Sequence, residues 1–299
     1  MIERMLEGGV LAGSVAWSGC AMTRPARTAP LATPTDLAVQ AVHFPSASGS
    51  TIRAWLVPGT AGAGAIVLLH GVGDNRTSML GRAAFLHRAG YTLLLPDFQA
   101  HGESDGRAIT FGALESLDAA AAVDFLRAST RGERIGLIGV SMGGAAALLG
   151  PGPVRADAFV LESVYPTIRQ ALDDRLAVWL GPFGALRRFV TPLMIQGVSG
   201  EIGIGEDALR PIDRVGQAGA PVFLLAGTRD NYTPLAEARE LFARANEPRE
   251  FWPVEGAGHE DLHAFARADY ERRVGAFLER YLRPQRISRH PLPDRLSSF

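Results

Sequence analysis

The sequence contains no lysine, because all 30 residues counted as Lys+Arg are arginine. This absence excludes chemistry that needs a lysine amine, such as a Schiff base or the phosphate-binding lysine of a P-loop. The only cysteine is Cys20, so the chain can form neither an intramolecular disulfide nor a cysteine cluster for a metal. A nucleophile, if there is one, must be another type of residue.

The sequence also lacks a large net charge and a long apolar run. A formal net charge of −1 provides no general attraction to polyanions, so we expect no nucleic-acid partner. No segment is long and apolar enough to span a membrane as a helix. The chain is 47% hydrophobic and 20% charged over 299 residues, which is typical of a globular protein and sufficient for one large α/β domain.

Residues 1–20 resemble a bacterial lipoprotein signal, in which an apolar run ends at a cysteine that is lipidated. Here that residue is Cys20. The segment departs from the usual pattern at Trp17, where leucine is common, and at Glu3 and Glu7, which replace a positively charged start. The resemblance predicts an envelope protein anchored to the membrane through a lipid on Cys20. The alternative is a cytoplasmic protein with an N-terminal extension.

Between a Pro/Thr/Ala-rich linker at 21–38 and a poorly ordered C-terminal tail at 284–299, residues 39–283 predict one domain. Short apolar runs alternate there with segments of helical spacing, which favours an α/β fold with a mainly parallel sheet flanked by helices. The first two strands predict an antiparallel hairpin at the sheet edge. The expected strands are 39–44, 51–57, 65–69, 91–95, 135–139, 158–161, 222–226 and 249–254, and the expected helices are 79–89, 115–127 and 263–281.

The alternation breaks between about 163 and 220. This interval is too long for a plain loop and too apolar to be disordered, so it predicts a helical cap over the carboxyl ends of the strands. The alternative is an ordinary connecting helix with an apolar face in the core. If the interval is a cap, its large apolar side chains predict an apolar substrate pocket. The residues expected to line it are Trp179, Phe183, Phe189 and Leu193.

The segment Gly139-Val140-Ser141-Met142-Gly143 has the G-x-S-x-G spacing of a nucleophile elbow, in which a serine lies on a sharp turn from a strand to a helix. An apolar run precedes it and an alanine-rich stretch follows it, so the required context is present. Glycines two residues before and after Ser141 keep side chains out of so tight a turn. Such a serine needs a base and a residue that orients the base.

Five motifs in order resemble the α/β-hydrolase superfamily, specifically its bacterial carboxylesterase and lysophospholipase-like branch. They are His70-Gly71, the stretch 96–104, the elbow at 139–143, the stretch 227–230, and Gly258-His259. The resemblance covers roughly Val39 to Arg283. It implies an α/β-hydrolase fold and no cofactor.

Carried over residue by residue, the resemblance implies that Ser141 is the nucleophile, His259 the base and Asp230 the acid that orients it. The backbone amides of Val72 and Met142 would form the oxyanion hole.

Rival residues exist for two of these roles. His263 is the main rival base and Glu162 the main rival acid, whereas Asp261 is too near His259 in sequence for triad geometry. We expect structural roles for three other residues: His70 should anchor the oxyanion loop, His101 should hold the loop after its strand, and Asp97 should brace that loop.

Metal binding is not expected, because the histidines are scattered and no paired-ligand spacing occurs. The resulting prediction is a serine hydrolase that cleaves a small-molecule or lipid ester through an acyl-enzyme intermediate. The same triad would also serve a lysophospholipase, a thioesterase or a peptidase, since the fold does not set the substrate. A different class is a non-catalytic ligand-binding protein on the same fold.

Overall fold

The structure, a computed structural model, describes residues 21–28 and 32–283. The predicted signal with Cys20 and the predicted tail at 284–299 lie outside the described residues.

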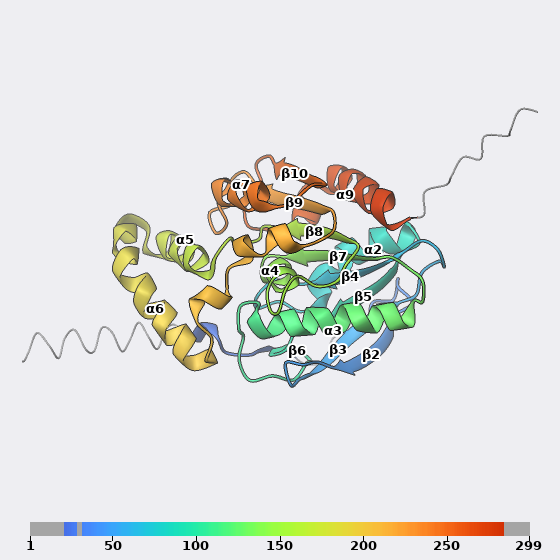
Figure 1. The fold of residues 1–299 in the computed structure, drawn as a ribbon, viewed down its shortest axis with the longest axis horizontal. Helices are drawn as coiled ribbons and strands as arrows, with labels where there is room; N and C mark the ends of the chain where they lie inside the picture. Colours follow the sequence, from blue (N-terminus) through green and yellow to red (C-terminus); the bar gives the residue numbers. More distant parts are fainter. Residues whose placement is uncertain (1–20, 29–31, 284–299) are drawn as a thin grey trace, which may run out of the picture.

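One eight-stranded sheet forms the centre of the molecule, with the strand order β10-β9-β8-β7-β4-β5-β3-β2 (Figure 1). Strand β3 pairs antiparallel with both β2 and β5, and all other neighbouring strands are parallel. The predicted hairpin and mainly parallel sheet are therefore confirmed. The strands are β2 (Gln40–Pro45), β3 (Thr51–Val57), β4 (Ala65–Leu69), β5 (Thr92–Pro96), β7 (Ile135–Val140), β8 (Ala158–Glu162), β9 (Val222–Gly227) and β10 (Arg249–Val254).

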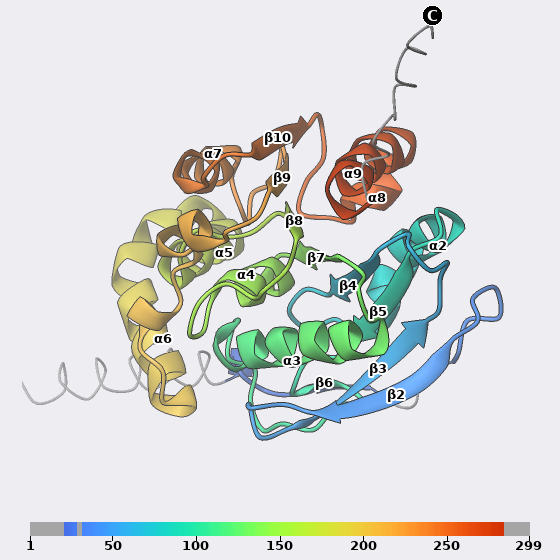
Figure 2. The same cartoon turned by 45° about the vertical axis from the view of Figure 1, so that its right-hand side comes forward.

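Helices cover both faces of the sheet, because the central strands are apolar on both sides. In β4, Val67 and Leu69 pack into a core shared with α3 (Ala113–Ser129), α4 (Met142–Leu148) and α7 (Leu235–Arg244). The alternate residues Ile66 and Leu68 pack into a second core with α2 (Leu80–Arg88) and α9 (Arg267–Leu282). This alternation follows from the two-residue period of a strand, and Figure 2 shows the layers.

Helices occupy most of the interval between β8 and β9, where the sequence predicts a helical cap. Helix α5 (Ile168–Leu180), the 3-10 segment η2 (Gly181–Leu186) and helix α6 (Arg187–Ile202) follow one another. They lie beside the sheet, at the left of Figure 1. Three short 3-10 turns then lead back to β9: η3 (Glu206–Ala208), η4 (Pro211–Asp213) and η5 (Val215–Gln217).

The remaining elements are short or divided. Strands β1 (Ala26–Arg27) and β6 (His101–Gly102) form a small parallel sheet, and the 3-10 segment η1 (Arg76–Met79) precedes α2. The single last helix that the sequence predicts is divided into α8 (Leu262–Phe265) and α9, because Ala266 leaves the helical conformation with φ −126° and ψ 47°. Within the described residues, no helix has the length and apolar character needed to cross a bilayer.

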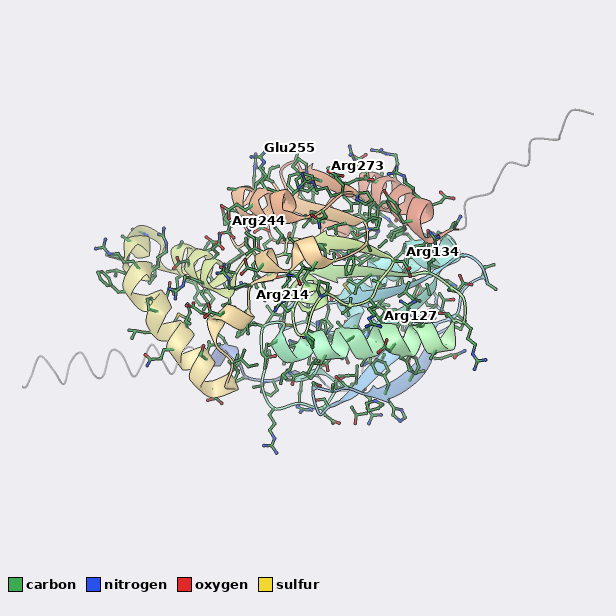
Figure 3. All side chains as sticks on the ribbon, viewed as in Figure 1. Arg127, Arg134, Arg214, Arg244, Glu255 and Arg273 are labelled. Carbon is green, nitrogen blue, oxygen red and sulfur yellow. The ribbon has the colours of Figure 1, made fainter. Side chains whose placement is uncertain are left out.

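Charged side chains lie mainly on the outside of the molecule. Arg127, Arg134 and Arg273, labelled in Figure 3, are all exposed. The exceptions to this distribution, which are buried arginines and carboxylates, gather near the carboxyl ends of the strands and are described next.

Candidate active site

Ser141 lies at the end of β7, immediately before α4, in a backbone conformation rare for a residue with a side chain (φ 50°, ψ −114°). Its amide donates to the carbonyl oxygen of Glu162 at 2.8 Å, and its carbonyl accepts from the amide of Ala145 at 3.0 Å. These bonds hold a strained turn that presents the hydroxyl beyond the sheet edge, as a nucleophile elbow requires.

The glycines around Ser141 are required by close backbone contacts. A Cβ atom on Gly139 would lie 2.6 Å from the Cα of Gly144, and one on Gly143 would lie 2.5 Å from the carbonyl oxygen of Leu69. A Cβ atom on Gly144 would collide with the side chain of Val164. The helix can therefore follow the strand this closely only with glycine at these positions.

His259 and Asp230 meet through a hydrogen bond of 2.8 Å between Nδ1 of the histidine and Oδ2 of the carboxylate. Asp230 follows β9 and His259 lies in the loop after β10, so two adjacent strands bring them together. The other oxygen of Asp230 accepts from the amides of Tyr232 and Thr233, each at 2.8 Å. A fixed carboxylate makes Nδ1 the donor, which leaves Nε2 as the basic nitrogen of His259.

Ser141 and His259 line one cavity of about 240 Å³. The structure thus brings the three predicted triad residues to one sheet edge, although they come from distant parts of the sequence. The other residues lining the cavity are Gly71, Val72, Asp74, Ser78, Met79, Arg82, Val140, Ser163, Arg175, Glu260 and Asp261.

The two predicted oxyanion donors also flank Ser141. Met142 is the first residue of α4, and Val72 lines the cavity from the loop after β4. A Cβ atom on Gly71 would lie 3.8 Å from the Cβ of Ser141, so this loop runs against the serine. The amide of Gly73 donates to Nε2 of His101 at 3.1 Å, which fixes the loop beside the site.

His70 and His101 have the contacts of structural histidines. Nε2 of His70 accepts from the amide of Phe98 at 3.1 Å, and Nδ1 lies 2.7 Å from the carbonyl oxygen of Gly71. Burial, with smaller contributions from the neighbouring His101 and Arg76, lowers the pKa of His70 to about 3, so the ring stays neutral. His101 bonds the carbonyl of Gln99 at 2.9 Å through its own Nδ1.

Asp97 is buried and bonded within the neighbouring loop rather than in the cavity. Its carboxylate accepts from the amide of Arg76 at 2.7 Å and from the amide of Glu103 at 2.9 Å. The Arg76 guanidinium also pairs with the carboxylates of Asp97 and Glu103. These are the bracing contacts expected of Asp97.

The rival acid Glu162 is engaged elsewhere. Its two carboxylate oxygens accept from Nε and Nη2 of Arg82 at 3.0 and 2.7 Å, and the Tyr270 hydroxyl adds a bond at 2.5 Å. Arg82 also pairs with Asp261 at 2.9 Å. Sequence reasoning missed this buried cluster, because its members are distant in the chain and only Glu162 ends a strand.

The rival base His263 lies outside the cavity. Its ring stacks on Phe85 with a centroid distance of 5.4 Å, and its Nε2 lies 3.2 Å from a carboxylate oxygen of Glu271. The structure therefore leaves His259 as the histidine that shares the cavity with Ser141.

The four predicted pocket residues do not line this cavity. Trp179, Phe183 and Phe189 are 58, 69 and 60% exposed, and Leu193 is half-buried. The reason is geometric: α5 meets the cavity at Arg175, and Trp179 lies one turn farther along the helix. The apolar composition of the interval could not reveal this offset.

No group of three or more His, Cys, Asp or Glu side chains within the described residues is arranged to hold a metal ion. The site consists of Ser141, the His259–Asp230 pair and the loop at Val72, gathered at one cavity. Such a set can carry out acyl transfer without a further component.

Comparisons with known proteins show the family and the fold. The model of the "alpha/beta hydrolase family" matches residues 66–273. An uncharacterized protein of Mycobacterium tuberculosis is 27% identical over 217 residues, which cover 71% of this chain and 69% of that protein. The uncharacterized protein YqkD of Bacillus subtilis is 25% identical over 246 residues, 79% of this chain and 78% of its own.

Among solved structures, the chain is similar to the Pyrococcus furiosus esterase Pf2001. The TM-score is 0.72 and the identity 26%, with 87% of this chain and 98% of that chain covered. The hydrolase GrgF of a Penicillium species shares the fold, with a TM-score of 0.65 and 20% identity over 82% of this chain and 99% of that chain.

Proposed function

Because this chain belongs to the alpha/beta hydrolase family, we propose that it is a serine hydrolase that cleaves carboxylic esters through an acyl-enzyme intermediate. The observation that carries the proposal is the 2.8 Å bond between His259 and Asp230, made beside the cavity that Ser141 and His259 share. The similarity to a protein described as an esterase supports ester substrates.

In the proposed first half-reaction, Oγ of Ser141 attacks the ester carbonyl carbon while its proton passes to Nε2 of His259. The amides of Val72 and Met142 donate to the oxygen that becomes negative, each contributing about 10²–10³ in rate. The carbon–oxygen bond to the alcohol then breaks, and His259 returns the proton to the departing alkoxide. The acyl group is left on Ser141.

In the second half-reaction, His259 removes a proton from water as the water attacks the acyl carbon. The bond to Oγ breaks, His259 returns the proton to Ser141, and the carboxylic acid leaves. Asp230 stays ionised throughout and stabilises the imidazolium each time it forms.

The direct test of this function is labelling of the purified protein with a fluorophosphonate, followed by assays on p-nitrophenyl esters of different acyl length. We expect a covalent adduct on Ser141 and turnover that disappears in Ser141→Ala. A native protein that neither forms the adduct nor hydrolyses any ester would contradict the proposal, and would favour a non-catalytic binding protein.

Thioesters, lysophospholipids and peptides are further substrates for the same residues, and the acyl-enzyme scheme is common to them. A panel that includes one member of each class ranks them by kcat/KM. An oxygen ester with the highest kcat/KM is the expected result.

A further inference from the structure

The helical insertion carries most of the exposed large apolar side chains of the described residues. The stretch 178–189, called here the insertion tip, joins the end of α5 to the first turn of α6, and its segment η2 has no buried residue. The side chains concerned are Val178 (42% exposed), Trp179 (58%), Phe183 (69%), Leu186 (49%) and Phe189 (60%), with only Phe265 (46%) found elsewhere. Soluble surfaces rarely concentrate apolar groups in this way.

The charged residues of the insertion tip itself are Arg187 and Arg188, both positive, and Asp174 of α5 lies near Arg187. Residues 175–200 contain Arg175, Arg187 and Arg188 and no aspartate or glutamate. Arg187 and Arg188 are exposed, and the guanidinium of Arg188 lies 4.6 Å from the ring centroid of Phe189. Exposed Trp and Phe beside arginines match the interface of a bilayer, where aromatic rings lie at headgroup depth and cations meet anionic lipids.

We propose that the insertion tip docks on a bilayer surface that contains anionic lipid. Trp179 and Phe183 would enter the interface, while Arg187 and Arg188 bind headgroup phosphates. Arg175, which lines the Ser141 cavity, lies one helical turn before Trp179, so docking would bring the cavity close to the membrane. The side chains predicted to line the pocket would then be exposed because they contact the membrane and not the substrate.

The test uses the full-length chain with Cys20→Ser, so that no lipid can be attached at that residue. Sedimentation with phosphatidylcholine vesicles, with or without phosphatidylglycerol, measures partitioning. Trp179→Ser/Phe183→Ser/Phe189→Ser should lower binding to the mixed vesicles at least about tenfold, because the apolar contact is lost. Phe265→Ser removes an exposed aromatic ring elsewhere and should leave binding unchanged. Matched melting temperatures exclude misfolding.

Charge is tested separately. Arg187→Gln/Arg188→Gln should lower the ratio of binding to anionic over neutral vesicles about tenfold. The control Arg131→Gln/Arg239→Gln has the same net charge and should keep the native ratio. In a chain that also carries Trp17→Phe, tryptophan fluorescence should shift to the blue on mixed vesicles and lose this shift in Trp179→Phe, since Trp55 and Trp252 are buried. Unchanged partitioning of the triple variant would overturn the proposal. So would a dimer in solution that the triple variant dissociates while vesicles remain unbound.

A second, independent observation concerns Arg175 itself. Its guanidinium lies over the Tyr232 ring, 5.4 Å from the centroid, and within the described residues it has no salt bridge or hydrogen bond. Arg82, the other arginine of the cavity, is by contrast paired with Glu162 and Asp261. Arg175 is half-buried, and burial lowers its pKa, whereas the nearby groups Tyr165, Tyr232, Asp230 and Asp174 oppose this shift without forming a salt bridge to the guanidinium.

We infer that Arg175 is a specificity residue that binds an anionic group of the substrate. This inference rests on the proposed function, and it names esters that carry a carboxylate or phosphate near the scissile bond. No carboxylate of the cavity forms a salt bridge with Arg175. Asp261 pairs with Arg82, and Glu260 accepts from the amide of Gly258 at 2.9 Å.

The probe pair is p-nitrophenyl butyrate and mono-p-nitrophenyl succinate, which have acyl chains of the same length and differ by a terminal carboxylate. The ratio of kcat/KM for succinate over butyrate should fall at least about tenfold in Arg175→Gln. It should not change in Arg169→Gln, which alters an exposed arginine of the same helix that pairs with Glu206. An unchanged ratio in Arg175→Gln would overturn the inference while leaving the proposed function intact. If the native chain hydrolysed neither ester and formed no fluorophosphonate adduct, both the Arg175 inference and the proposed function would be refuted.

Discussion

Nδ1 of His259 lies 2.8 Å from Oδ2 of Asp230, whose other oxygen is held by the amides of Tyr232 and Thr233. The carboxylate is fully buried, whereas the histidine side chain is 21% exposed. The acid is therefore fixed by the fold, and the base faces the cavity.

This relationship predicts the effect of Asp230→Asn. The amide can donate to Nδ1, which would put the proton on Nε2 and leave the histidine unable to accept from Ser141. We expect kcat to fall by about 10⁴ with little change in melting temperature. Asp213→Asn, on an exposed carboxylate, is the matched control. Retention of activity within about tenfold in Asp230→Asn would mean that another residue orients His259.

The elbow predicts a large difference between two glycines. A Cβ atom at Gly143 would lie 2.5 Å from the Leu69 carbonyl oxygen, whereas one at Gly200 meets nothing within 4 Å. Gly143→Ala should therefore displace the turn at Ser141 and abolish fluorophosphonate labelling. Gly200→Ala should label normally and melt at the same or a higher temperature, because alanine favours a helix. Equal labelling of both variants would contradict the proposed packing of the elbow.

The buried cluster of Arg82, Glu162 and Tyr270 predicts a loss of stability. Glu162→Ala leaves the Arg82 guanidinium with only Asp261, and removing one partner of a buried pair costs about 3–5 kcal/mol. Tyr270→Phe removes the hydroxyl that bonds Glu162 and should cost about 1–3 kcal/mol. Urea unfolding measures both, with Glu279→Gln in an exposed pair as the control. Equal stability of all three variants would show that the cluster does not support the fold.

A carboxyl pair between α5 and α7 predicts how stability depends on pH. The carboxyl groups of Glu237 and Asp174 influence each other electrostatically, and burial, followed by the charge of Asp174, raises the pKa of Glu237 to about 8. Between about pH 4.5 and about pH 8, the carboxyl of Glu237 keeps its proton in the folded state but loses it in the unfolded state. The free energy of unfolding should therefore fall as pH rises through this range.

Glu237→Gln mimics the protonated carboxyl and should remove most of this slope. Near pH ~8 the variant should be more stable than the native chain by on the order of 1 kcal/mol, after allowance for solvent screening. Urea unfolding at several pH values measures the difference, and Glu201→Gln is the control on an exposed residue. A native slope of the opposite sign would show that Glu237 is ionised in the folded state.

The strands and helices that a short residue pattern determines were predicted from the sequence. Ala65–Leu69 is apolar at every position, and a strand buried on both faces was expected and found there. The triad residues could be nominated because they stand in motifs that resemble the α/β-hydrolase superfamily, and the structure places each of them after a strand of the sheet. The hairpin of β2 and β3 was located to within a residue at each end.

Features that depend on distance in space were not predictable in this way. The pairing of Arg82 with Glu162 joins residues 80 positions apart, and nothing in either local pattern marks it. Trp179 was expected in the pocket because it is large and apolar, but its position along α5 places it on the surface. The divided last helix depends on the single conformation of Ala266, which no composition rule specifies.

The central claim is that Ser141 is the nucleophile of an acyl-transfer reaction. Mass spectrometry of the intact chain after treatment with a fluorophosphonate, followed by peptide mapping, tests it most directly. The expected result is one stoichiometric adduct on Ser141, absent from Ser141→Ala and strongly slowed in His259→Ala. An adduct on another serine, or an unmodified Ser141 in protein that hydrolyses esters, would contradict the account.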